Sequence, residues 1–345
     1  MMNLTTRQRI TNPLIHLANR VGIVDAYSVI KGYYSSQITI LMYHRVGPQN
    51  DRWQPPPVPP EDFEDQMQYL KKTHEILKLT DVAHALLEHR PLPKKGAVVT
   101  FDDGYKSNYD YAFPILKKYG IPATIFLATG HIDTGTLFWW DKIRYALWHT
   151  RHQRLIVDDL GTFTLRSLNE KRQKTSGIIE RVKKFPEHKK NSIIDHLITT
   201  ADITIPPTLG HRVIVSWDEV REMHTHGIEF GAHTVTHPIL TKVSLEQASY
   251  EITQSKKDIE NALGTPVTTF SYPNGKQADF NTEILHMVQT SGYTCAVTTL
   301  PTTNASPDTL YLLGRLIPWN YASFKLFISG LYSDAKTILQ KIGVP

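Results

Sequence analysis

The sequence predicts an α/β protein built on a parallel β-sheet. Short apolar runs alternate with longer segments of helical pattern along the 345 residues, and this alternation is typical of parallel sheets. Several runs are continuously apolar, as expected for strands covered on both faces. Two runs end directly in acidic residues or histidines, which places reactive side chains where strands meet loops.

Seven strands are expected in chain order. They are residues 38–43, 97–101, 123–128, 228–232, 268–272, 294–298 and 313–317. Helices are expected between and after them. These are residues 62–72, 107–119, 216–227, 244–263, 281–291 and 321–341.

The helix ends carry their own signals. Ser216 and Ser244 each stand three residues before Glu or Gln, the pattern of a capping box. Gly227 and Gly264 can close the same two helices. Pro114 interrupts the segment 107–119 and should kink it.

The chain is expected to divide into an N-terminal helical extension, residues 1–36, and a main domain, residues 37–345. Residues of about 130–212 are polar and partly helical, and we interpret them as an insertion because strand-like runs on either side continue one fold. Within the insertion, residues 170–190 hold eight Lys or Arg against three Glu. A solvated helical face explains this best, and the alternative is contact with an anionic membrane surface or a phosphate-bearing carrier.

Composition excludes several classes. No run of about 18 apolar residues occurs, so no transmembrane helix is predicted. Charged residues interrupt every apolar run near the N-terminus, so no signal peptide is predicted and a cytoplasmic location is expected. The single cysteine, Cys295, allows no intrachain disulfide and is expected in the core. Nothing resembles a nucleic-acid-binding module.

Two pairs of reactive side chains follow strands directly. Asp102 and Asp103 come after strand 97–101, and His233 and His237 come after strand 228–232. Each pair alone is weak evidence for a catalytic site, because Asp-Asp-Gly also suits a tight turn and the chain has 16 histidines. Together, one acid and two histidines form a metal site that leaves positions open for water and substrate. The adjacent acid can then take a proton from the water.

At these residues the sequence resembles the polysaccharide deacetylases of carbohydrate esterase family 4, the NodB homology domain. Thr100-Phe101-Asp102-Asp103-Gly104 and His233-Thr234-Val235-Thr236-His237 match its first two motifs completely. The runs L-M-Y-H-R-V, F-S-Y-P-N-G and Gly314-Arg315-Leu316 look like the branch that acts on poly-N-acetylglucosamine or exopolysaccharides. The resemblance covers roughly residues 38–332 and implies a distorted (β/α) barrel with a helical insertion.

The resemblance also implies a reaction and a set of roles. N-acetyl groups of an N-acetylated sugar, glycan or glycolipid precursor would be hydrolysed, releasing acetate. Asp102 would be the general base, and the backbone N–H of Tyr105 would hold the oxyanion. A divalent ion would be held by three ligands, with zinc the default and cobalt, nickel or iron the alternatives. The three ligands would be Asp103, His233 and His237.

Two features depart from the family pattern. An arginine expected beside the base is missing near Ser271, and Arg315 is the candidate replacement, with a structural salt bridge as the alternative. A late catalytic histidine is also missing, and His44 is the candidate acid, with a core position as the alternative. These departures leave open a catalytically impaired carbohydrate-binding barrel. A hydrolase of other non-peptide C–N bonds also stays open.

The sequence gives the least information about the residues that contact the substrate. Tyr272 and Pro273 are expected to bind substrate, and Trp139, Trp140 and Trp319 could stack on sugar rings. The alternative is that the first two tryptophans anchor the insertion. Residues 55–60, which are rich in proline, form either a surface loop or the rim of a cleft.

Overall fold

The computed structural model describes residues 23–24, 27, 37–49, 51–301, 305–318 and 321–331. The expected extension, residues 1–36, falls almost entirely outside this set, as do Trp319 and the last expected helix beyond residue 331. No helix within the described ranges is long and apolar enough to cross a membrane.

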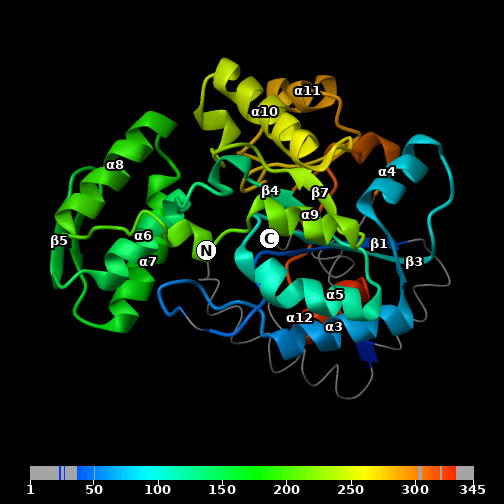
Figure 1. Cartoon of the computed structure of the whole chain (residues 1–345), viewed down its shortest axis with the longest axis horizontal. Coiled ribbons are helices and arrows are strands. Elements are labelled where there is room, and N and C mark those ends of the chain that lie inside the picture. The colour runs from blue at the N-terminus through cyan, green and yellow to red at the C-terminus, as the bar shows by residue number, and fades with distance from the viewer. Residues whose placement is uncertain are drawn as a thin grey trace, which may run out of the picture.

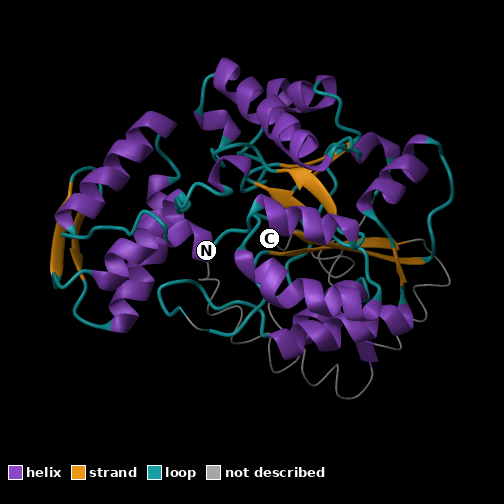
Figure 2. Cartoon of the chain, viewed as in Figure 1, coloured by secondary structure: helices purple, strands orange, loops and turns teal. Residues whose placement is uncertain are grey.

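A parallel sheet forms the centre of the molecule, as predicted (Figure 1; Figure 2). Its main strands run in the spatial order β1-β3-β4-β7-β8-β9, and the short β2 (Glu75–Ile76) pairs with β3. Their bounds are β1 Gln37–Tyr43, β3 Lys95–Phe101, β4 Thr124–Leu127, β7 Glu229–Ala232, β8 Thr269–Ser271 and β9 Cys295–Val297. The first six expected strands are thus confirmed, with ends that differ by one or two residues.

The seventh expected strand is reduced to two bridges. Leu313 pairs with Val297 of β9, and Leu316 pairs with Leu41 of β1, in both cases parallel. Between them the ladder breaks, because the N–H of Arg315 turns to the carbonyl oxygen of Leu300 at 3.2 Å. The bridges join the two edge strands and curl the sheet toward a barrel, in agreement with the distorted (β/α) barrel that was expected.

Helices cover the outside of the sheet (Figure 2). Their bounds are α3 Pro60–Thr73, α4 Leu79–Leu87, α5 Phe113–Tyr119, α9 Trp217–Thr225, α10 Leu245–Leu263, α11 Thr282–Thr290 and α12 Tyr321–Ile328. The capping box at Ser216 is complete, and the Ser244 hydroxyl accepts the N–H of Gln247. Gly264 ends α10 in the left-handed conformation, at φ 68°, which glycine adopts without steric cost.

The interruption expected at Pro114 takes the form of a wider helical turn. Residues Asn108–Ala112 are π-helical, and α5 begins directly after them with Pro114 in its first turn. Proline is tolerated there because the first N–H groups of a helix have no partner inside it.

Residues 130–212 contain three α-helices and a hairpin beside the barrel (Figure 1). The helices are α6 Trp139–His149, α7 Leu168–Val182 and α8 Glu187–Thr200. The hairpin, β5 (Arg154–Val157) with β6 (Gly161–Thr164), is antiparallel and was not expected from the sequence. The boundaries of an inserted domain stay a prediction.

The basic residues of the insertion have varied surroundings. Lys171 donates to two backbone carbonyls, of Trp148 and Thr150, while Lys189 pairs with Asp159. Lys190 is buried, with its ammonium 4.6 Å from the ring centroid of Trp139. The segment is therefore not one uniform solvated face. Elsewhere, Cys295 is fully buried, as expected.

Candidate active site and metal centre

The two reactive pairs follow β3 and β7, which lie on either side of β4 in the sheet, and both pairs have strained backbone conformations. Asp102 extends β3, and its N–H donates to the carbonyl oxygen of Tyr43. Asp103 then turns at φ 76°. In the second loop, Thr234 and His237 also have positive φ, at 68° and 56°. Such values are uncommon for residues other than glycine, and they reverse the chain so that side chains point back over the sheet.

Asp103, His233 and His237 meet at one point, as the sequence predicted. Oδ1 of Asp103 lies 3.5 Å from Nε2 of each histidine, and the two Nε2 atoms are 3.1 Å apart. Tetrahedral ligands at about 2.0–2.1 Å from zinc would lie roughly 3.3 Å from one another. The spacing therefore fits a metal ion, and within the described chain these are the residues that form such a group.

The orientation of His233 and the low pKa of His237 suit a metal, whereas burial at His233 is outweighed by Asp102 and then Asp103, which raise the pKa of His233. Nδ1 of His233 lies 2.7 Å from the carbonyl oxygen of Ser271 and must donate to it, which leaves the Nε2 lone pair facing Asp103. Burial and then the neighbouring His233 hold the pKa of His237 well below its ordinary value. A neutral imidazole is the form that binds metal ions.

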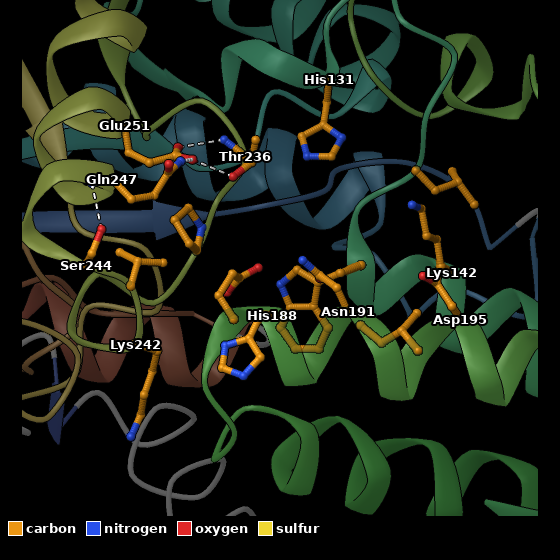
Figure 3. A pocket seen from close by; sticks show the side chains of 16 residues that line it. His131, Lys142, His188, Asn191, Asp195, Thr236, Lys242, Ser244, Gln247 and Glu251 are labelled. Carbon is orange, nitrogen blue, oxygen red and sulfur yellow. Dashed lines mark hydrogen bonds between the residues drawn. The ribbon is translucent and has the colours of Figure 1, made fainter.

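A buried glutamate on α10 holds the histidine loop in place (Figure 3). The Glu251 carboxylate accepts the N–H groups of Val235 and Thr236 at 2.7 and 2.8 Å, and the Thr236 hydroxyl at 2.6 Å. Glu251 is fully buried. These bonds fix the turn between the two metal-ligand candidates, so Glu251 positions both imidazoles. No motif in the sequence signals this role.

Arg315 holds the other aspartate. Its Nη1 and Nη2 donate to the two carboxylate oxygens of Asp102 at 2.7 and 2.6 Å, and Nη2 also donates to the Ser271 hydroxyl at 2.9 Å. Both charged groups are buried. Burial raises the pKa of Asp102, but Arg315 and then His233 outweigh it and hold the pKa below its ordinary value. An arginine from the chain beyond β9 therefore contacts Asp102, while the role of Arg315 as replacement for the missing arginine stays a prediction beside the structural salt bridge.

Both aspartates and both histidines open into a cavity of about 320 Å³. His44 lies in its wall and is exposed, so it can reach a bound molecule. The backbone N–H of Tyr105 has no acceptor among the described residues and can donate to an oxyanion. The Tyr105 ring also lies in the wall, fixed by its hydroxyl bonds with Trp140 and Asp141.

Two expected substrate contacts lie elsewhere. The Tyr272 ring is fully buried and stacks on Phe280, with the ring centroids 4.6 Å apart. Neither Tyr272 nor Pro273 lines the cavity, whereas Asn274, the next residue, does. A role of the first two in substrate binding has no support from this geometry and stays a prediction.

The tryptophans divide between two cavities. Trp140 lines the catalytic cavity, and its indole lies 4.6 Å from the His237 ring, centroid to centroid. Trp139 lines a larger cavity of about 650 Å³ on the other side of the histidine loop, which Thr236 and Pro238 also line (Figure 3). None of the metal-ligand candidates faces that larger cavity, so we assign the chemistry to the smaller one. Both indoles are mostly buried, which also fits the anchoring alternative.

A family model described as Polysaccharide deacetylase matches residues 89–159 and 189–296 of the chain. The chain belongs to the polysaccharide deacetylase family. The matched residues include both aspartates and both histidines of the cavity. The interval between the two matched parts covers β6 and α7, which lie within the expected insertion.

The chain is similar in sequence to proteins named as deacetylases. YxkH of Bacillus subtilis, named as a polysaccharide deacetylase, is 25% identical over 293 residues, which are 85% of this chain and 75% of YxkH. The poly-beta-1,6-N-acetyl-D-glucosamine N-deacetylase of Staphylococcus epidermidis is 41% identical over 75 residues, 21% of this chain and 26% of that protein.

Solved deacetylase structures have the same fold. IcaB of Ammonifex degensii superposes with a TM-score of 0.57 at 18% identity, covering 86% of this chain and 98% of IcaB. PplD of Streptococcus pyogenes gives 0.56 at 22% identity, covering 82% of this chain and 93% of PplD. These likenesses concern the fold alone.

Several cavity residues were not singled out from the sequence. They are Met42, Arg45, Arg144, Ile179, Lys183, Asn274, Lys276, Thr299 and Ile317. Arg45 could have been found, because it follows His44 at the end of a predicted strand. Pro55 shows that the proline-rich stretch contributes to the rim of the cavity. Nothing in the sequence placed Arg144 or Lys183 at the cavity, since only the fold brings the insertion to this place.

Proposed function

We propose that this deacetylase hydrolyses the N-acetyl group of an amino sugar in a glycan or glycolipid precursor and releases acetate. One arrangement carries the proposal: an ionised carboxylate, Asp102, lies in the same cavity as a three-residue metal site. His233 Nε2 is 4.0 Å from the Asp102 carboxylate, so base and site share one small volume. The family supports N-deacetylation as the reaction class.

Each residue has a separate task in this proposal. Asp102 accepts the proton of the water that attacks the acetyl carbon, and Arg315 keeps that carboxylate ionised and oriented. The Tyr105 N–H donates to the oxygen that gains charge. A divalent ion held by Asp103, His233 and His237 would supply Lewis-acid polarisation, with zinc the first choice and cobalt, nickel or iron the alternatives.

The leaving amine needs a proton, and we assign its donor to His44. His44 lies in the cavity wall and is exposed, while its carbonyl oxygen accepts the side-chain N–H of Asn108 at 2.8 Å. That bond fixes the backbone and leaves the ring available to the amine. The impaired-barrel alternative loses its motivation, because an arginine reaches the base and a histidine lies in the cavity.

Acetate release tests the proposal. Metal-loaded protein is incubated with N-acetylglucosamine oligomers, poly-β-1,6-N-acetyl-D-glucosamine and a cyclic amide. We expect acetate from the amino sugars. Asp102→Asn should lower the rate by about 10²–10⁴, whereas Asp308→Asn, on the exposed side of a short helix, should leave it unchanged. Turnover of the cyclic amide alone, or full activity of Asp102→Asn, would refute the assignment.

The location of the protein belongs to the same proposal. We infer a cytoplasmic protein, and contact of the basic residues of α7 and α8 with a membrane surface remains the alternative to a solvated helical face. Fractionation of cells that express the full chain tests this inference. Recovery in the periplasm or the culture medium would contradict it.

A further inference from the structure

We propose that the catalytic cavity selects glycans that carry an anionic group, a phosphate ester or a carboxylate, beside the acetylated sugar. This inference rests on the proposed function and adds the substrate class. Four cationic side chains line the cavity: Arg45, Arg144, Lys183 and Lys276. The acidic side chains in the wall are Asp102 and Asp103, and both are engaged with other groups.

Among these four cations, Arg45 gives the strongest argument for an anionic ligand. It follows β1 and is partly buried, with its guanidinium 5.7 Å from the ring centroid of Tyr105. Its Nη1 donates to the carbonyl oxygen of Pro55 at 3.0 Å, and among the described residues it forms no ion pair with a carboxylate. Burial lowers the pKa of Arg45, and Tyr105 and Asp141 only partly offset this. A partly desolvated cation of this kind is stabilised when an anion occupies the adjoining space.

The insertion supplies two more cations. Arg144 comes from α6 and pairs with the buried Asp141 at 2.8 Å, with 22% of its side chain exposed. Lys183 follows α7 and pairs with Glu180 at 2.9 Å, with 24% of its side chain exposed. Lys183 also lies in the interval that the family model leaves unmatched. Lys183 thus adds a positive charge to the cavity wall from outside the matched part of the family, whereas Arg144 lies within that part.

Lys276 is the fourth cation of the group. It lies in the loop after β8, and its ammonium is 3.8 Å from the same Glu180 carboxylate that Lys183 contacts. Two lysines therefore share one exposed acid, so positive charge remains in excess around the cavity. Its volume, about 320 Å³, is at the small end of the roughly 300–1,000 Å³ typical of ligand pockets. A sugar placed at the metal site would bring its neighbouring substituent against these cations.

Matched probes separate charge from sugar recognition. N-acetylglucosamine 1-phosphate is compared with methyl N-acetylglucosaminide, and a tetrasaccharide that alternates N-acetylglucosamine with glucuronate is compared with chitotetraose. Binding is measured calorimetrically on metal-stripped protein, where no ion can ligate the anion, and acetate release is measured on loaded protein. The first pair tests phosphate and the second tests carboxylate.

We expect at least one anionic probe to bind about tenfold tighter than its neutral partner at low salt, with the advantage shrinking as salt screens the charges. Arg45→Gln and Lys183→Gln should each remove most of this advantage. Lys174→Gln makes the same charge change on an exposed position of α7 outside the cavity and should preserve it.

The outcomes keep the two proposals apart. Equal binding of anionic and neutral probes, or an equal effect of Lys174→Gln and Lys183→Gln, would overturn the anionic preference. Acetate release from neutral sugars alone would do the same and would leave deacetylation standing. Selective anion binding without acetate release from any probe would support the anionic site and count against the deacetylase assignment.

Discussion

Arg315 and Asp102 form a buried two-point ion pair although 213 positions separate them in the chain. The same guanidinium donates to the carbonyl oxygen of Thr298 and to the hydroxyl of Ser271. Its orientation is therefore fixed by the end of the sheet, and the carboxylate is fixed in turn. The pair keeps the proposed base charged in a site where burial alone would favour its protonated form.

Replacing Arg315 should shift the pH dependence of the reaction. In Arg315→Gln the group that most lowers the pKa of Asp102 is gone, so the acid limb of kcat/KM should move to higher pH. Arg315→Lys keeps the positive charge and should therefore move the acid limb less. Removing one partner of a buried pair also costs about 3–5 kcal/mol, so folding is checked by circular dichroism. An acid limb that stays in place in both folded variants would contradict the role of Arg315.

Metal binding should stabilise the fold. A ligand that binds only the folded state at a hundredfold excess over Kd adds about 2.7 kcal/mol. We expect chelation to lower Tm, and zinc to restore it in wild type but not in Asp103→Asn or His237→Asn. His286→Asn, on the exposed face of α11, serves as control and should respond like wild type. A metal response that survives in His237→Asn would place the ion elsewhere.

Glu251 should increase the metal affinity of the site although it does not contact the ion. Glu251→Gln loses an acceptor for the N–H groups of Val235 and Thr236, so the histidine loop should loosen. Changes in groups that orient metal ligands typically cost about 10–100-fold in affinity. Competition with a fluorescent zinc chelator measures the loss. Glu246→Gln, an exposed position on the same helix, should show none, and an equal effect of the two variants would refute the positioning role.

Two half-buried histidines, His74 and His131, should weaken the fold in acid. Burial and then Lys95 lower the pKa of His74 from 6.5 to about 4. Burial lowers the pKa of His131 from 6.5 to about 4 as well. As the pH falls, these histidines therefore bind protons in the unfolded chain before they do so in the folded one. Their contribution to the free energy of unfolding is complete above pH 6.5, decreases between pH 6.5 and about pH 4, and does not change further below that. At about 1.4 kcal/mol per pKa unit, each contributes at most about 3.5 kcal/mol. Urea unfolding of His74→Gln and His131→Gln should show a shallower fall than wild type, and an unchanged slope would contradict the prediction.

Much of the site could be predicted because its residues follow strands directly. The ends of parallel strands share one edge of the sheet, so placing Asp103 and His233 after two strands was enough to bring them together. Arg315 was found as a candidate by the same reasoning. Capping signals at Ser216 and Ser244 fixed two helices to within a few residues.

The other parts of the fold and the site could not be predicted from the sequence because they depend on tertiary packing. The hairpin of β5 and β6 is short and lies in a polar segment, so its periodicity does not distinguish it from a loop. Lys183 and Arg144 reach the cavity only because the insertion packs beside the barrel. Tyr272 stands next to a motif, but the alternation of side chains along its strand sends its ring into the core.

A crystal structure of zinc-loaded protein, with anomalous scattering recorded at the zinc edge, tests the central claim most directly. The account predicts one strong peak within about 2.0–2.2 Å of Asp103 Oδ1, His233 Nε2 and His237 Nε2, with the Asp102 carboxylate unbound beside it. A fully loaded protein whose only peak lies away from these three atoms would contradict the account.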